Sequence, residues 1–135
     1  MTEDNRRRNV TNEVERASQA LRSAEALVAL GLHADAVSRA YYAAFHLIRA
    51  LLLTRGVEPR SHQGAFHLLN VELIRAGEFP SSHNRLLSGL QRQREIADYD
   101  AAVVFSAEDA QAAVADAHAF AADAQAALER WGFGA

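Results

Sequence analysis

Residues 33–55 read HADAVSRAYYAAFHLIRALLLTR, and they are apolar on nearly every side of the helix that they predict. The main stripe at helical spacing is Val37, Tyr41, Ala44, Phe45, Ile48, Leu51 and Leu52. The opposite side is also apolar, with Ala43, Leu47, Ala50 and Leu53. A helix that is apolar all round is central or lies at a subunit interface. The segment therefore indicates an all-α core, and its second apolar side predicts a homodimer.

Glycines and capping residues divide the rest of the chain into further helices. Gly31, Gly56 and Gly77 each follow an apolar periodic run, where a left-handed C-terminal cap is expected. Ser61, and Ser106 with Asp109, can cap helix N-termini. We expect the other helices over residues 9–30, 62–76, 81 or 82 to about 97, and 106 to about 131. The connector with Val103, Val104 and Phe105 is apolar enough to predict that it lies against the bundle.

The composition fits one soluble domain over residues 1–135, with residues 1–8 as a frayed basic tip. The chain has 135 residues, of which 50% are hydrophobic and 23% are charged. Its net charge of −3 lacks the basic excess of a non-specific DNA binder, so any nucleic-acid contact must be local. No stretch approaches the ~18 apolar residues of a membrane span, and we expect a cytoplasmic protein without membrane contact.

Arg94 lies in the stretch LQRQREIADYD, residues 90–100, on the apolar side of a predicted helix. On a helical wheel it falls within roughly 100° of Leu86, together with Leu87, Leu90 and Ala97. A buried guanidinium is costly unless it is paired, so this position calls for a carboxylate, a phosphate or a shared cleft. Asp98 lies one turn further along the same side. The two interpretations are an ion pair that braces the bundle and a recessed polar site.

Two histidines also stand out. His62 begins a predicted helix, where the dipole lowers an imidazole pKa and favours the neutral form, which can act as a base. The alternative is a histidine that packs on Phe66. His46 and Arg39 lie along one line of the 33–55 helix, which suits a phosphate contact, an interface across a two-fold axis, or a solvated face.

Metal and cofactor signatures are absent from the sequence. No Glu stands three residues before a His, no two His are four apart, and there is no Cys. Glycine-rich phosphate loops and a nucleophile elbow are also missing. We therefore predict no metal site and no cofactor, and any chemistry must come from scattered helix residues.

Three ordered motifs, SRAYYAAFHLIRALLLTRG, SHQGAFHLL and LQRQREIADYD, together resemble the HEPN family of small helical bundles. They are similar to the branch whose pattern runs S-R-A-Y-Y-A-x-F, T/S-H-x-G and R-x-x-A-D-Y, over residues 36–100. The resemblance implies an up-and-down bundle of four or five helices and homodimerisation. In active members it implies a metal-independent ribonuclease, and many members are toxins encoded beside a minimal nucleotidyltransferase antitoxin.

The sequence departs from the active-site pattern of that family, which is Arg, four to six residues, then His. Counting from Arg92 reaches residues 97–99, counting from Arg94 reaches residues 99–101, and neither range holds a His. Cleavage of RNA through its 2′-hydroxyl needs a base for the nucleophile and an acid for the leaving oxygen. Asp98 is a poor donor near neutral pH, since an ordinary Asp titrates near ~3.9.

The leading hypothesis is a HEPN-type dimer that binds RNA or a nucleotide phosphate and acts with a nucleotidyltransferase partner. Arg94, Asp98, Tyr99 and His62 would form the cleft, with Arg39 and His46 as further phosphate contacts. One alternative is an active ribonuclease toxin in which His62 or His46 replaces the missing motif His. The other is a structural interaction module in which Arg94, Asp98 and Tyr99 brace the bundle.

Overall fold

The computed structural model describes residues 2–134, which form an all-α bundle with no strand in that range. Its five α-helices are α1 (Glu3–Ala29), α2 (His33–Leu53), α3 (His62–Leu69), α4 (Asn84–Tyr99) and α5 (Ala107–Arg130). A π-helical turn, η1 (Asn70–Ile74), continues α3, and a 3-10 turn, η2 (Ser81–His83), precedes α4. The all-α prediction is confirmed.

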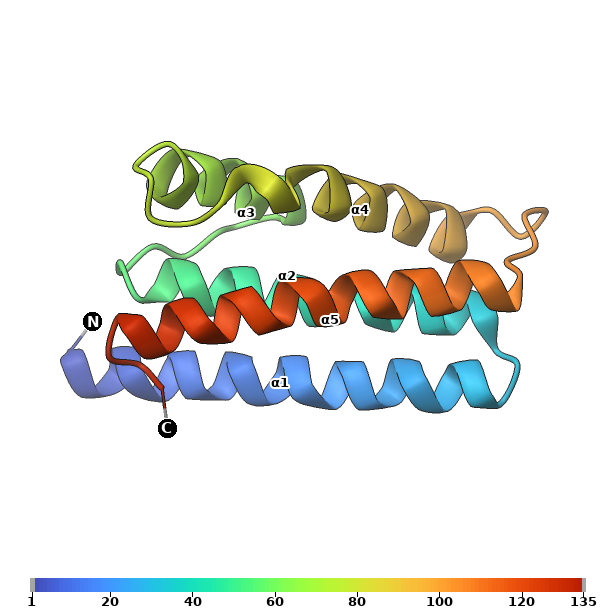
Figure 1. The fold of residues 1–135 in the computed structure, drawn as a ribbon, viewed down its shortest axis with the longest axis horizontal. Helices are drawn as coiled ribbons and strands as arrows, with labels where there is room; N and C mark the ends of the chain where they lie inside the picture. Colours follow the sequence, from blue (N-terminus) through green and yellow to red (C-terminus); the bar gives the residue numbers. More distant parts are fainter. Residues whose placement is uncertain (1, 135) are drawn as a thin grey trace.

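Helix α2 is the centre of the bundle and packs against α1, α3, α4 and α5 (Figure 1). Its second apolar side, Ala43, Leu47, Ala50 and Leu53, is buried within the single chain. The sequence predicted that this helix is either central in the bundle or lies at a subunit interface, and the structure shows that it is central. The exposed apolar side from which a homodimer was predicted is therefore not present, and that argument for a dimer was wrong.

The predicted caps are confirmed. Gly31, Gly56 and Gly77 have φ of 78°, 72° and 76°, in the left-handed region where glycine is favoured. Ser61 Oγ accepts the amide of Gly64 at 2.9 Å. Ser106 and Asp109 form a reciprocal capping box at the start of α5.

The basic tip is part of α1, which begins at Glu3 and not at residue 9. Thr2 caps it, with Oγ1 accepting the amide of Asn5 at 3.1 Å. Arg7 also contacts residues near the C-terminus. Its Nη1 donates to the carbonyl of Gly132 at 2.7 Å, and its guanidinium lies over the ring of Phe133. The N- and C-terminal ends lie at the same end of the bundle (Figure 1).

The third helix departs from its predicted course at Asn70. The Asn70 side chain donates to the carbonyl of Phe66 at 3.0 Å and accepts from Asn84 at 3.1 Å. The amide of Arg75 bonds back five residues to the carbonyl of Asn70 at 2.8 Å. The predicted helix over residues 62–76 is therefore α-helical only to Leu69, with a π-helical turn after it.

The prediction for the α4–α5 connector was wrong for two of its three apolar residues. Val103 is 43% exposed and Val104 is 88% exposed, while Phe105 packs against the core. A local turn explains the difference, since Asp100 accepts the amide of Ala102 through its carboxylate and that of Val103 through its carbonyl. This turn directs both valines outward.

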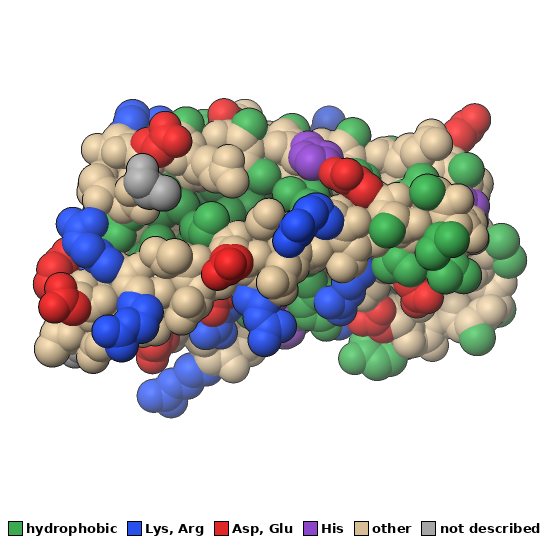
Figure 2. Space-filling model, turned by 90° about the horizontal axis from the view of Figure 1, so that it is seen from below, with side chains coloured by type: hydrophobic (Ala, Val, Ile, Leu, Met, Phe, Trp, Pro, Cys, Tyr) green, Lys and Arg blue, Asp and Glu red, His purple; other side chains and the backbone are tan. Residues whose placement is uncertain are grey.

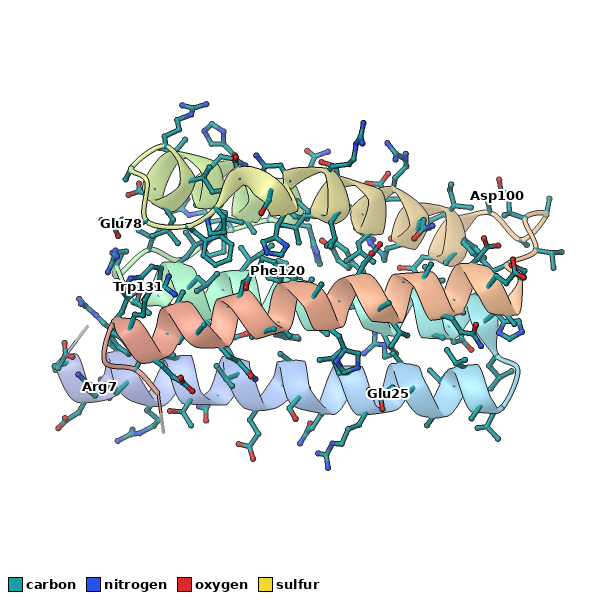
Figure 3. The ribbon with its side chains drawn as sticks, in the orientation of Figure 1. Arg7, Glu25, Glu78, Asp100, Phe120 and Trp131 are labelled. Carbon is teal, nitrogen blue, oxygen red and sulfur yellow. The ribbon has the colours of Figure 1, made fainter. Side chains whose placement is uncertain are left out.

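Helix α5 covers the core with small residues and one large ring. The predicted seam, Ala110, Val114, Ala117, Ala121, Ala124 and Leu128, is buried. Phe120, expected at the edge of that seam, is fully buried between α5 and the segment that leads into α4 (Figure 3). Its ring meets Phe79 at a centroid distance of 5.8 Å and His83 at 5.4 Å. Phe120 is therefore the main bulky contact from α5 to that segment.

Candidate functional site

The three sequence motifs meet at one place on the bundle. Tyr41 of α2, His62 at the start of α3 and Arg94 of α4 lie together there. The Tyr41 hydroxyl and His62 Nδ1 are hydrogen-bonded at 2.7 Å. The guanidinium carbon of Arg94 lies 4.9 Å from the centre of the Tyr41 ring. We call Tyr41, Tyr42, Phe45, His62 and Arg94 the tyrosine–histidine cluster.

The N-terminal turn of α3 fixes the position of His62. Because Ser61 caps the helix through the amide of Gly64, residue 64 lies close to the Ser61 hydroxyl. A Cβ on residue 64 would lie 2.9 Å from Ser61 Oγ, so glycine fits there without a shift. This explains the S-H-x-G spacing, which places His62 as the first residue of the helix.

Phe45 packs on His62 and not in the centre of the core. The two rings are stacked with centroids 4.2 Å apart, and Phe45 is only partly buried. The sequence pattern placed Phe45 in the core stripe, and that assignment was wrong. Phe66, the predicted alternative partner of His62, contacts Tyr41 instead, at a centroid distance of 6.4 Å.

The surroundings of the cluster favour neutral forms of both His62 and Tyr41. Burial lowers the pKa of His62 below its ordinary value, and the nearby charges of Arg94, His46 and Arg49 lower it further. Burial also raises the pKa of Tyr41 to about 12, against the opposing effect of Arg94. At neutral pH the pair is therefore an uncharged imidazole hydrogen-bonded to an uncharged phenol.

Arg94 is buried, as its position on the helical wheel predicted, with a side chain only 10% exposed. Its Nη1 lies 3.6 Å from Asp98 Oδ2, an ion pair that is longer than a hydrogen bond. Its Nε is buried and has no hydrogen-bond partner among residues 2–134. The chain therefore does not use the full donor capacity of this guanidinium.

A second group of polar side chains joins α1 to α2 beside the first. Glu13 Oε2 bonds His46 Nδ1 at 2.7 Å, and Glu13 Oε1 accepts from Arg49 Nε at 3.1 Å. We call these three residues the Glu13 cluster. Sequence analysis missed Glu13, because no local pattern in α1 indicates a partner 33 residues away.

The remaining predicted residues lie at the rim. Arg39 is exposed, with its guanidinium carbon 4.7 Å from the centre of the Tyr42 ring. Tyr99 is 80% exposed and lies in a shallow depression that Arg92 and Arg94 also line. The structure thus places Asp98 beside Arg94 of the cluster, while Tyr99 lies exposed at the rim of the depression that Arg94 also lines. Figure 2 shows arginine and acidic side chains intermixed over the face that α1 forms, without one extended basic surface there.

Within residues 2–134, no group of three or more His, Asp or Glu side chains is arranged to hold a metal ion. In the same range, none of the helices combines the length and the apolar character that crossing a membrane requires.

Comparison with known proteins identifies the fold family. The family model of the HEPN domain matches residues 12–126, which include both clusters. The chain belongs to the HEPN domain family. Its relatives include the protein named "Putative toxin MJ0142" of Methanocaldococcus jannaschii, which is 30% identical over 114 residues, 84% of this chain and 78% of the relative.

Two shorter matches agree with this assignment to the HEPN family. The protein named "Putative toxin MJ0605" of the same organism is 47% identical over 47 residues, 35% of each chain. The protein named "UPF0332 protein PH1297" of Pyrococcus horikoshii is 43% identical over 56 residues, 38% of this chain and 39% of the relative. Tyr41, His62 and Arg94 all lie within the residues that the HEPN family model matches.

Replacing Glu13 with glutamine should lower stability at neutral pH by about 1.5 kcal/mol, because Glu13 makes charge-assisted bonds to His46 and Arg49. Burial alone would raise the pKa of Glu13, but His46 and Arg49 bring it below its ordinary value of 4.5. The stabilisation is therefore present above pH 4.5 and is lost as pH falls through the lower folded-state pKa. Thermal unfolding from pH 3 to pH 7 should show a smaller acid loss in Glu13→Gln than in the parent chain.

The exposed Glu15 of the same helix provides a matched control. Glu15→Gln should unfold like the parent chain at every pH. If Glu13→Gln and Glu15→Gln give the same profile, the bonds of the Glu13 cluster contribute nothing to stability.

Proposed function

We propose that this chain is a toxin-like cytoplasmic protein that binds the phosphate backbone of RNA at the tyrosine–histidine cluster. The observation that carries the proposal is Arg94, whose guanidinium lies over the Tyr41 ring and forms a long ion pair with Asp98, while its buried Nε has no hydrogen-bond partner among the described residues. The depression shared with Arg92 and Tyr99 reaches this side chain. A guanidinium with unused donors suits a phosphate oxygen.

The aromatic side chains favour RNA over free phosphate as the ligand. Tyr42 and Phe45 are only partly buried, and each has an arginine over its ring, Arg39 at 4.7 Å and Arg49 at 5.8 Å. Unpaired bases stack on aromatic and guanidinium planes, while arginines follow the backbone. This combination supports a single-stranded segment lying across α2.

The toxin-like part of the proposal is supported by the relatives whose names describe toxins. A homodimer and a minimal nucleotidyltransferase antitoxin are proposed as partners from the resemblance of the three motifs to the HEPN family. A dimer would place a second copy of each cluster in the assembly.

A second candidate function is metal-independent cleavage of the bound RNA, with His62 as the base. The specific observation is that His62 lies beside Arg94, is held by Tyr41 and Phe45, and has a pKa below its ordinary value. When Nδ1–H donates to the Tyr41 oxygen, Nε2 keeps its lone pair and can accept the proton of a 2′-hydroxyl. The Arg94 charge would stabilise the developing phosphorane.

Replacing Arg94 with alanine should weaken binding of a single-stranded RNA oligonucleotide by roughly 10-fold or more, since hydrogen bonds to charged groups contribute about 1.5 to 3 kcal/mol. The slope of log affinity against log salt should fall by about 0.7 for each phosphate that Arg94 no longer neutralises. Folding should survive, because the substitution removes a buried charge that is incompletely paired. Fluorescence anisotropy across a salt series and thermal unfolding measure both effects.

Arg85→Ala is the matched control, because Arg85 is exposed and lies nine residues earlier, on the opposite side of α4. It should bind RNA like the parent chain. A stability loss of about 3 to 5 kcal/mol in Arg94→Ala with unchanged RNA affinity would instead assign Arg94 to bracing Asp98.

A further inference from the structure

Cleavage of RNA through its 2′-hydroxyl needs two proton-transfer groups, and His62 supplies only one of them. A second imidazole, that of His46, contacts the same aromatic ring as His62. The ring of Phe45 stacks on His62 at 4.2 Å and also meets the ring of His46 at 5.8 Å. One partly exposed aromatic ring thus separates two histidines that come from different helices.

We infer that His46, held by Glu13, is the general acid of this site and acts together with His62 as the base. The inference rests on the cleavage activity proposed above. It assigns different roles to the two histidines and gives Glu13 the role of a positioning residue.

The bond to Glu13 determines which atom of His46 is free to act. With Nδ1 held by Glu13 Oε2 at 2.7 Å, the remaining ring nitrogen, Nε2, has no hydrogen-bond partner in the described part of the chain. Arg49 Nε donates to the other oxygen of Glu13 at 3.1 Å, so the carboxylate is held at both oxygens. The His46 side chain is 25% exposed and the Glu13 side chain 17%, which leaves the imidazole accessible and the carboxylate mostly covered. A carboxylate that orients a histidine in this way is typical of acid–base sites.

The two histidines have electrostatically different surroundings. His62 faces Tyr41, Tyr42 and Phe45 of α2 and the positive charge of Arg94 from α4, with smaller effects from His46 and Arg49 of α2. His46 faces the negative charge of Glu13 from α1, with Arg49 on its own helix bound to the same carboxylate. Pairs of titratable groups in opposite environments commonly divide the roles of acid and base.

The proposed step balances without any further reactant. Nε2 of neutral His62 takes the proton of the 2′-hydroxyl, and the 2′-oxygen forms a bond to phosphorus. The bond from phosphorus to the 5′-oxygen breaks, and the 5′-oxygen takes the Nε2 proton of the His46 imidazolium. The products are a 2′,3′-cyclic phosphate and a free 5′-hydroxyl, and both histidines then exchange protons with water.

The test compares a normal single-stranded RNA oligonucleotide with one that carries sulfur in place of the 5′-bridging oxygen at the cleavage position. A thiolate leaves without protonation, so only loss of a general acid should be rescued by the sulfur substrate. His46→Ala should lower the cleavage rate of normal RNA at pH 7 by about 10²- to 10⁴-fold and leave the rate with the sulfur substrate near that of the parent chain. His62→Ala should be slow with both substrates.

Glu13→Gln tests the positioning role. It should cause a smaller loss than His46→Ala, and the sulfur substrate should rescue that loss too, because Glu13 acts through the general acid His46. His118→Ala is the matched control, since His118 is bonded to Glu25 in a similar pair between α5 and α1, apart from the site. It should leave both rates unchanged. Circular dichroism checks folding, and His46→Gln replaces His46→Ala if the alanine variant is unfolded.

The outcomes separate this inference from the proposed function. An unchanged rate in His46→Ala, or a loss that the sulfur substrate does not rescue, overturns the assignment of His46 while cleavage stands. A parent chain that binds RNA but does not cleave it overturns both the cleavage function and this inference. A parent chain that does not bind RNA overturns the proposed function itself.

Discussion

Replacing Phe120 with alanine is expected to lower the free energy of unfolding by about 3 to 5 kcal/mol. Phe120 is fully buried, and its ring meets Phe79 and His83, which lie before and in η2. Its neighbours along the buried face of α5 are mostly alanines, such as Ala117 and Ala121, which cannot reach into the space that the ring leaves. The cavity should therefore persist and the full cost should be measured by urea unfolding.

Phe45→Ala is the matched control for this prediction, because Phe45 is an aromatic residue of the same size that is only partly buried. It should cost about 1 to 2 kcal/mol, since part of the ring already faces water in the folded chain. Equal losses from the two substitutions would show that Phe45 belongs to the core after all. The helical pattern alone ranked these two residues in the reverse order.

Replacing His62 with alanine is expected to reduce the rate of RNA cleavage by about 10²- to 10⁴-fold, if the chain cleaves RNA as proposed. Because the pKa of His62 is below its ordinary value of 6.5, the base form dominates at neutral pH. The rate of the parent chain should therefore fall only at pH values below 6.5, and His62→Ala should lack this acid limb. A pH–rate profile from pH 4 to pH 8 measures both effects.

His67→Ala is the control for that substitution, because His67 is exposed on the same short helix. It should keep both the rate and the acid limb. RNA affinity should change little in His62→Ala, since neutral His62 adds no charge. An acid limb that persists in His62→Ala would assign the base to another group.

Much of the fold was predictable because it depends on local signals. The caps at Gly31 and Ser106 and the stripe of α2 depend only on residues within a few turns of one another. The errors arise where a side chain overrides the local pattern, as at Asn70, or where a turn changes direction, as at Asp100. The burial of Phe120 also required the tertiary structure, since its partners precede it by 41 and 37 residues.

The candidate site was predictable only in part. Arg94 was found because a charge on an apolar helix face is anomalous within its own helix. Tyr41 was assigned to the core, and its bond to His62 depends on how α3 returns over α2. Glu13 has no anomaly in its own helix, and it becomes notable only when α1 and α2 are placed side by side (Figure 1).

Helix α2 holds the bundle together through its buried side, which is most of its surface, and carries Tyr42, Phe45, His46 and Arg49 on a narrow, partly exposed side. Mutational tolerance along this helix should therefore be low on both sides, for two unrelated reasons. If the chain is toxic as proposed, a genetic selection for cells that survive its overproduction would recover changes on either side of α2 together. Only a measure of the amount of folded protein would separate the variants that no longer fold from those that fold and no longer act.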